Sequence, residues 1–210
     1  MLQLTRYFLK LSLVFSALIF MSCGSPLDYY SQSHGLCQNS EALASGYLVT
    51  GECHTLSWGG SFPITLNLDQ NLPPIFFQAF EKAINTWHSA LGRSVFQLRT
   101  GLSNSNNVKL LAQDEWKNTG GEDLQQARTV YRYEKNKIVD FNILFNNVLQ
   151  YSLDINTNTV HLTTLITHEL GHVLGLAHTQ GGLMNAILPN GVERQPEHSD
   201  IQKIVNLYFF

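Results

Sequence analysis

The strongest constraint on this chain is the eleven-residue segment 168–178, which reads HELGHVLGLAH. Apolar residues recur every three or four positions from about residue 160 to residue 174, which predicts an amphipathic helix. His168 and His172 are four residues apart, so both imidazoles lie on one face of this helix and can reach one ion. Gly175 allows a sharp left-handed turn at the helix end. His178 can then approach the same ion from the side.

Three histidines with this spacing suit Zn²⁺ and leave one tetrahedral position for water, which is typical of a catalytic zinc site. Zinc lowers the pKa of such a water and polarises a carbonyl group. Glu169 flanks the ion and is the candidate catalytic residue, acting as general base and then as general acid. The pattern therefore predicts one Zn²⁺ and hydrolysis of peptide bonds. A lone histidine, or a bare H-E-x-x-H, also occurs in unrelated chains, but Gly175 and His178 make this pattern far more specific.

Segment 168–178 resembles the extended zinc motif of the metzincin metallopeptidases, in which a methionine turn follows the third histidine. Residues 181–185 (GGLMN) resemble that turn, with Met184 at the position of its methionine. The gap between His178 and Met184 is short, and Thr179 stands where the matrixins usually have serine. The likeness is therefore closest to the matrixin family.

The resemblance covers about residues 55–210 and implies an α+β fold. In detail, it implies a twisted five-stranded mixed sheet with three helices, the active-site helix being followed by the methionine turn. Residues 64–68, 80–87, 138–146 and 199–208 resemble the first strand, first helix, the strand before the catalytic helix and the closing helix. The periodicity of the sequence predicts strands at about 62–68, 94–100, 107–112, 127–134 and 138–145, and helices at about 73–91, 160–174 and 197–208.

The resemblance also implies how a protein or peptide substrate in extended conformation would bind. The strand of residues 127–133 would be the sheet edge above the active-site cleft, where a peptide can pair in register. Thr129, Val130 and Tyr131 are therefore candidate substrate-binding residues, although such residues are also ordinary strand formers. Leu188 and Pro189 would form an apolar wall beside the leaving side of the scissile bond.

The sequence departs from the matrixin pattern in three respects. Ser199 stands where the closing helix usually has the first of two aspartates. Residues 112–137 contain no histidine, whereas animal matrixins hold a structural zinc there, so we expect one zinc. No segment matches the latency peptide with its cysteine. Loop Asp and Asn residues could hold Ca²⁺, but no recognisable calcium-loop pattern supports it.

Residues 1–22 are typical of a secretory signal, because Arg6 and Lys10 precede an apolar run, residues 11–21, that is too short to span a bilayer. Cys23 follows Ser22 as in the bacterial lipoprotein box, although Phe20 stands where leucine is usual. Lipidation of Cys23 would anchor the protein to a membrane surface. The alternative is cleavage and release. We expect an exported protein of the bacterial cell envelope, either an outer-membrane lipoprotein or a secreted protein.

Residues 23–54 are expected to be a tether with a disulfide loop, and residues 55–210 the peptidase domain. Cys37 and Cys53 remain once Cys23 is set aside, and two cysteines in an exported chain most often pair. The alternative is that one thiolate caps the zinc and keeps the enzyme latent. Without the leader the formal charge is −5, with no cluster of basic residues, so no nucleic-acid partner is expected. We expect a monomer.

Two other functions are compatible with the sequence. The first is a non-catalytic binding lipoprotein of the envelope surface that retains the zinc site. The second is a zinc amidase that acts on cell-wall peptides by the same chemistry. Glu169 argues against the binding protein, because metal binding alone does not need that carboxylate.

Overall fold

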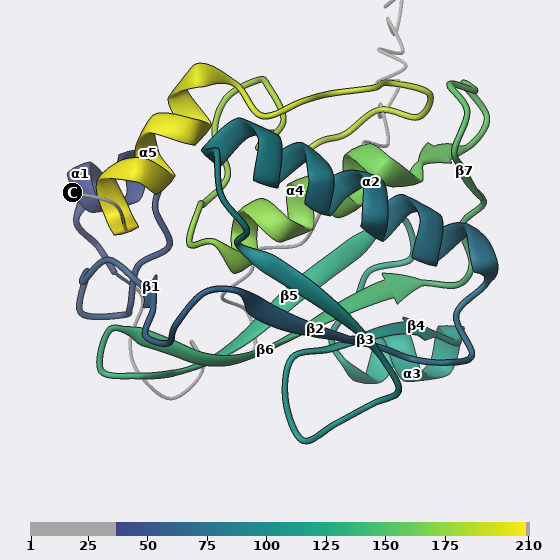
Figure 1. The fold of residues 1–210 in the computed structure, drawn as a ribbon, viewed down its shortest axis with the longest axis horizontal. Coiled ribbons are helices and arrows are strands. Elements are labelled where there is room, and N and C mark those ends of the chain that lie inside the picture. The colour runs from purple at the N-terminus through teal and green to yellow at the C-terminus, as the bar shows by residue number, and fades with distance from the viewer. Residues whose placement is uncertain (1–36, 209–210) are drawn as a thin grey trace, which may run out of the picture.

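The computed structural model describes residues 37–208, and these form an α+β domain (Figure 1). The predicted signal at residues 1–22 and the predicted lipidation at Cys23 lie outside the described residues. The helices are α1 (Ser40–Ala44), α2 (Pro74–Leu91), α3 (Gln113–Asn118), α4 (Leu162–Val173) and α5 (His198–Tyr208). The strands are β1 (Ser57–Trp58), β2 (Ile64–Leu68), β3 (Phe96–Thr100), β4 (Asn107–Leu111), β5 (Ala127–Glu134), β6 (Lys137–Asn146), β7 (Tyr151–Ser152) and β8 (Val160–His161).

Within the described part of the chain, the main sheet contains six strands. Strands β1, β6, β4, β2 and β3 are parallel to their neighbours in that order, and β5 runs antiparallel to β6. Among the described strands β5 pairs only with β6, so β5 is an edge strand, as expected. The five strands and three long helices that the sequence predicts are all present. The additional elements β1, β7, β8, α1 and α3 have two to six residues, which is too short for a periodic pattern to show.

Helices α2 and α4 lie side by side on one face of the sheet (Figure 1). Phe76, Phe80 and Trp87 on the inner face of α2 are at most 1% exposed. Burial of each such side chain stabilises the fold by about 2–3 kcal/mol. The indole nitrogen of Trp87 also donates a hydrogen bond to the carbonyl oxygen of Thr167 at 2.9 Å. This bond fixes α4 against α2 one residue before His168.

The segment before β1, which lies in the range 23–54 predicted to be a tether with a disulfide loop, packs against the domain near residue 48. Leu48 belongs to the hydrophobic core, and its amide donates to the carbonyl oxygen of Gly175 at 2.9 Å. The amide of Ala177 donates to the carbonyl oxygen of Gly46 at 3.0 Å. A disulfide joins Cys37 to Cys53 and closes the loop that contains this segment. Residues near 47 therefore hold the stretch of chain that leads to His178.

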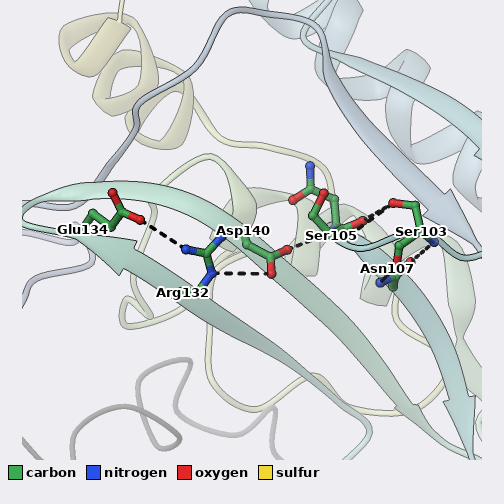
Figure 2. A network of polar contacts seen from close by, with 7 residues as sticks. Ser103, Ser105, Asn107, Arg132, Glu134 and Asp140 are labelled. Atoms are coloured by element: carbon green, nitrogen blue, oxygen red, sulfur yellow. Dashed lines mark hydrogen bonds and ion pairs between the residues drawn. The ribbon is translucent and has the colours of Figure 1, made fainter.

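A polar network fastens the loop between β3 and β4 to the sheet (Figure 2). The carboxylate of Asp140 on β6 accepts a hydrogen bond from the amide of Asn106 at 2.7 Å. Arg132 on β5 lies 3.9 Å from the same carboxylate and 3.3 Å from that of Glu134. Both oxygens of Asp140 therefore contact groups of the protein.

None of the helices within residues 37–208 has the length and hydrophobicity needed to cross a bilayer.

Candidate metal centre

Three imidazoles converge at the C-terminal end of α4. His168 and His172 are fully buried, and their ring centroids are 4.6 Å apart. The side chain of His178 closes the group, so that one ligand atom from each histidine lies within 4.8 Å of the others. The Nε2 atoms of His172 and His178 are 3.1 Å apart. Nitrogen ligands of a tetrahedral Zn²⁺ lie about 3.3 Å from one another, so this spacing suits zinc.

The turn after α4 brings His178 back to the helix. Gly175 has φ +95°, a left-handed conformation that glycine adopts at little cost. Its amide donates to the carbonyl oxygen of His172 at 2.8 Å, and the amide of Leu176 donates to that of Gly171 at 3.0 Å. These two bonds form a Schellman motif, which ends the helix and redirects the chain. A Cβ at residue 175 would lie 3.1 Å from the carbonyl oxygen of Leu56, so space also favours glycine here.

Backbone carbonyls orient the two helical histidines. Nδ1 of His168 lies 2.7 Å from the carbonyl oxygen of Leu183, and Nδ1 of His172 lies 2.7 Å from that of Leu176. A carbonyl only accepts, so each Nδ1 carries the hydrogen and each Nε2 keeps its lone pair for a metal. Nε2 of His168 is buried and has no hydrogen-bond partner among residues 37–208. A buried acceptor without a partner is costly, and a metal ion at the centre of the cluster would satisfy it.

The same burial keeps the imidazoles neutral. Burial, with a smaller contribution from the neighbouring His178, lowers the pKa of His168 to about 3. Burial also places the pKa of His172 well below its ordinary value, with smaller contributions from His168 and His178. The pKa of His178 falls to about 4 for the same reason. Neutral imidazole is the form that binds metals, so the site is ready for Zn²⁺ at neutral pH.

Glu169 follows His168 directly in α4 and is fully buried. Its Oε2 atom accepts a hydrogen bond of 2.5 Å from the hydroxyl group of Thr129, which is also fully buried. Thr129 is the third residue of β5 and lies opposite Ile143 on β6. The sequence assigned Thr129 to substrate binding, and the structure adds that its side chain contacts Glu169.

The methionine turn packs beneath the helix. Met184 is fully buried, and a Cβ placed on Gly171 would lie only 2.6 Å from its sulfur atom. The turn is fastened to its surroundings by two bonds: the amide of Thr179 donates to the carbonyl oxygen of Met184 at 2.8 Å, and the guanidinium of Arg194 donates to that of Gly182. Because Met184 packs on Gly171, the methionine turn contacts α4 at the residue that precedes His172 in the sequence.

The other four candidate substrate-binding residues differ in how far their side chains are exposed to solvent. Val130 is half-buried on the edge strand, whereas Tyr131 is 3% exposed and belongs to the core. Leu188 is buried, and Pro189 is exposed. These two residues lie against Thr164 and Leu165 of α4 around a gap too small to admit a water molecule. Leu188 is held in place by the side chain of Gln126, whose amide donates to its carbonyl oxygen at 2.9 Å.

Sequence reasoning missed several contributors to the site. These contributors orient or pack the groups of the site. They are the carbonyl groups of Leu176 and Leu183, the backbone of Gly171, and the side chains of Gln126 and Arg194. Of these residues Gly171 and Leu176 lie inside the motif, but a carbonyl group exists at every position and carries no sequence signal. His161 does not belong to the cluster, because its two ring nitrogens contact the hydroxyl group of Thr164 at 2.8 Å and the carbonyl oxygen of Leu153 at 3.2 Å.

The fold and the three-histidine cluster define a domain of the metzincin type. Comparison with family models adds the family: the matrixin model matches residues 75–209, which is more than half of the chain. The chain belongs to the matrixin family, whose members are zinc metallopeptidases. No curated protein matches the chain.

Proposed function

We propose that this chain is a zinc-dependent endopeptidase that cleaves extended protein substrates. The observation that carries the proposal is the convergence of His168, His172 and His178 beside the buried carboxylate of Glu169. A zinc site that served only stability would not need a buried acidic side chain at this place, because burial of a carboxylate is costly.

The three imidazoles would hold the metal through nitrogen, with Nδ1 of His168 and of His172 already bonded to carbonyl groups. Bound there, Zn²⁺ would supply Lewis acidity toward a water molecule and toward the substrate carbonyl. Glu169 would accept the proton of the attacking water and pass it to the nitrogen of the departing amine. The peptide C–N bond breaks as the new C–O bond is completed, so one carboxylate serves both proton transfers.

Substrate alignment would come from β5. This strand lies at the edge of the sheet and carries Thr129, whose hydroxyl contacts Glu169, so a peptide paired along β5 passes close to the carboxylate. Pairing of an extended segment with an edge strand supplies backbone hydrogen bonds without regard to sequence. Leu188 and Pro189 would contact an apolar side chain of the substrate.

The test is cleavage of an unfolded protein and of a peptide library by the zinc-loaded chain, beside its Glu169→Ala variant. The expected result is cleavage by the wild type, loss of cleavage with a chelator, and loss by at least about 100-fold in the variant although the variant still binds zinc. If the wild-type protein cut no peptide at full zinc occupancy, this result would contradict the proposed endopeptidase function. Exclusive cleavage of cell-wall peptides would favour the amidase instead.

We further propose export and lipidation at Cys23. Arg6, Lys10 and the apolar run that follows support a signal. The Cys37–Cys53 disulfide supports an oxidising compartment. Mass spectrometry of the protein from an envelope fraction tests this proposal: diacylglycerol on an N-terminal Cys23 is expected, and an unmodified chain that begins elsewhere would contradict it.

A further inference from the structure

We infer that Thr129 is a positioning residue for Glu169: its hydroxyl group sets the orientation in which the carboxylate receives the proton of the attacking water. This inference rests on the proposed function. Thr129 lies on the edge strand β5, and this role of its side chain is separate from the pairing of the strand with a substrate.

The first support is the contact itself. The Thr129 hydroxyl lies 2.5 Å from Oε2 of Glu169, and both residues are 0% exposed. Hydrogen bonds from a hydroxyl to a carboxylate are short and strong, with oxygens 2.5–2.7 Å apart. Because both residues are buried, protein groups set the orientation of the carboxylate.

The second support is the setting of Thr129 in β5. Side chains alternate along a strand, so Thr129 shares its face with Ala127 and Tyr131. Both neighbours are core residues, with 0% and 3% exposure. A hydroxyl on this face would be buried among apolar groups without a partner, which is unfavourable. Glu169 supplies the partner across the interface between β5 and α4.

The third support is the geometry of proton transfer. A general base works only when it lies within hydrogen-bond reach of the proton it removes. Glu169 lies on a long side chain with several rotatable bonds, and a small displacement of a reacting group can cost a large factor in rate. A carboxylate has about four acceptor positions, so the bond from Thr129 fixes its orientation without using up its capacity to accept a proton.

Three variants separate the hydroxyl from the shape of the side chain. Thr129→Val keeps the shape and removes the hydroxyl, and Thr129→Ser keeps the hydroxyl and removes the methyl group. The matched control is Thr163→Val in α4, because Thr163 is also buried and its hydroxyl has no hydrogen-bond partner among residues 37–208. Each variant is loaded with zinc, and kcat and KM are measured on one peptide that the wild type cleaves. Zinc affinity is measured by competition with a coloured chelator, and the urea midpoint is recorded.

Thr129→Val is expected to lower kcat by about 10- to 100-fold, within the range of acid–base catalysis, with KM and zinc affinity within about twofold of the wild type. Thr129→Ser is expected to retain kcat within about threefold, and Thr163→Val to match the wild type. In the Glu169→Ala background, Thr129→Val should no longer lower the urea midpoint, because the hydrogen bond is already gone.

The inference is overturned if Thr129→Val keeps wild-type kcat, if Thr129→Ser loses as much kcat as Thr129→Val, or if the main change is in KM or zinc affinity. If Thr129→Val fails to fold, Thr129→Ser and Thr129→Ala are compared: equal kcat in these two variants overturns the inference, and a tenfold lower kcat in Thr129→Ala supports it. A wild type without peptidase activity overturns the proposed function, a result distinct from these.

Discussion

Nδ1 of His168 lies 2.7 Å from the carbonyl oxygen of Leu183, the residue that precedes Met184. The methionine turn therefore orients a histidine of the metal site through its backbone, while the methionine side chain packs on the same helix at Gly171. A change in the packing of Met184 should reach His168 through this bond. Contacts of this kind commonly change metal affinity by about 10- to 100-fold.

Gly171→Ala tests that packing. Alanine normally stabilises a helix interior relative to glycine by about 0.5–1 kcal/mol. Here the new Cβ would lie 2.6 Å from the sulfur of Met184, so we expect a net loss of roughly 1–2 kcal/mol and weaker zinc binding. Urea denaturation and chelator competition measure the two effects.

The double variant Gly171→Ala/Met184→Ala provides the control for this prediction. Since Met184→Ala removes the colliding atoms, the loss of stability in the double variant should be smaller than the sum of the two single losses. Simple additivity would contradict a collision between these two side chains.

Substitution of single histidines should separate ligands from structural residues. His172→Ala is expected to weaken zinc binding by about 100-fold or more, since even groups that only orient ligands contribute 10- to 100-fold. His161→Ala is the matched control, because His161 is also buried but contacts Thr164 and Leu153. It should lower stability and leave zinc affinity within about threefold. Equal zinc affinity of the two variants would rule out His172 as a ligand.

The zinc-free protein should become less stable in mild acid. Burial lowers the pKa of His168 to about 3 and that of His178 to about 4, whereas both titrate near 6.5 in the unfolded chain. Between these values the unfolded chain binds more protons than the folded protein. The free energy of unfolding should therefore fall as pH drops below about 6.5, by up to about 1.4 kcal/mol per pH unit for each histidine.

Urea denaturation in the presence of a chelator, from pH 8 to pH 5, measures this dependence. Above about pH 7 these histidines are neutral in both states, so their contribution should not vary. The variant His178→Gln should show a smaller slope below pH 6.5. A wild-type stability that stays constant or rises on acidification would show that the histidines are not held neutral by the fold.

The disulfide between Cys37 and Cys53 should stabilise the protein and strengthen zinc binding, although neither cysteine belongs to the metal site. Cys37 and Cys53 are 16 residues apart, and closure of a loop of this size stabilises by about 3 kcal/mol in the chain-entropy model. The loop contains Gly46 and Leu48, which bond to Ala177 and Gly175 on the path to His178. The double variant Cys37→Ser/Cys53→Ser should therefore lose about 2–4 kcal/mol of stability and also bind zinc more weakly.

Reductant serves as the control for the disulfide. It should destabilise the wild type to the level of the double serine variant and leave that variant unchanged. Unaltered zinc affinity after reduction would mean that the loop does not help to hold the segment before His178.

The long periodic elements were predictable from the sequence to within about two residues. Helix α4, for example, was expected at about 160–174 and spans Leu162–Val173. Its apolar period and the glycine that follows carry this information, because both act locally along the chain. The matrixin resemblance, now confirmed for residues 75–209, implied the type of sheet and the edge position of the strand of residues 127–133.

Contacts made by backbone atoms between distant residues were not predictable. The carbonyl groups that orient His168 and His172 exist at every position, so no residue type marks them. Residues 46–48 pair with residues 175–177 through backbone groups as well, so these contacts had no signal in the sequence either. Thr129 has a strand-forming residue type, and its bond to Glu169 became visible only when β5 and α4 were placed together.

The most direct test of the account is X-ray diffraction from crystals of the zinc-loaded protein at energies above and below the zinc absorption edge. We predict one strong anomalous peak, with Nε2 of His168 and His172 and a ring nitrogen of His178 each at about 2.0–2.1 Å. A fourth position should be open to solvent on the side of Glu169. No peak, or a peak that lacks any one of these histidines as a ligand, would contradict the account.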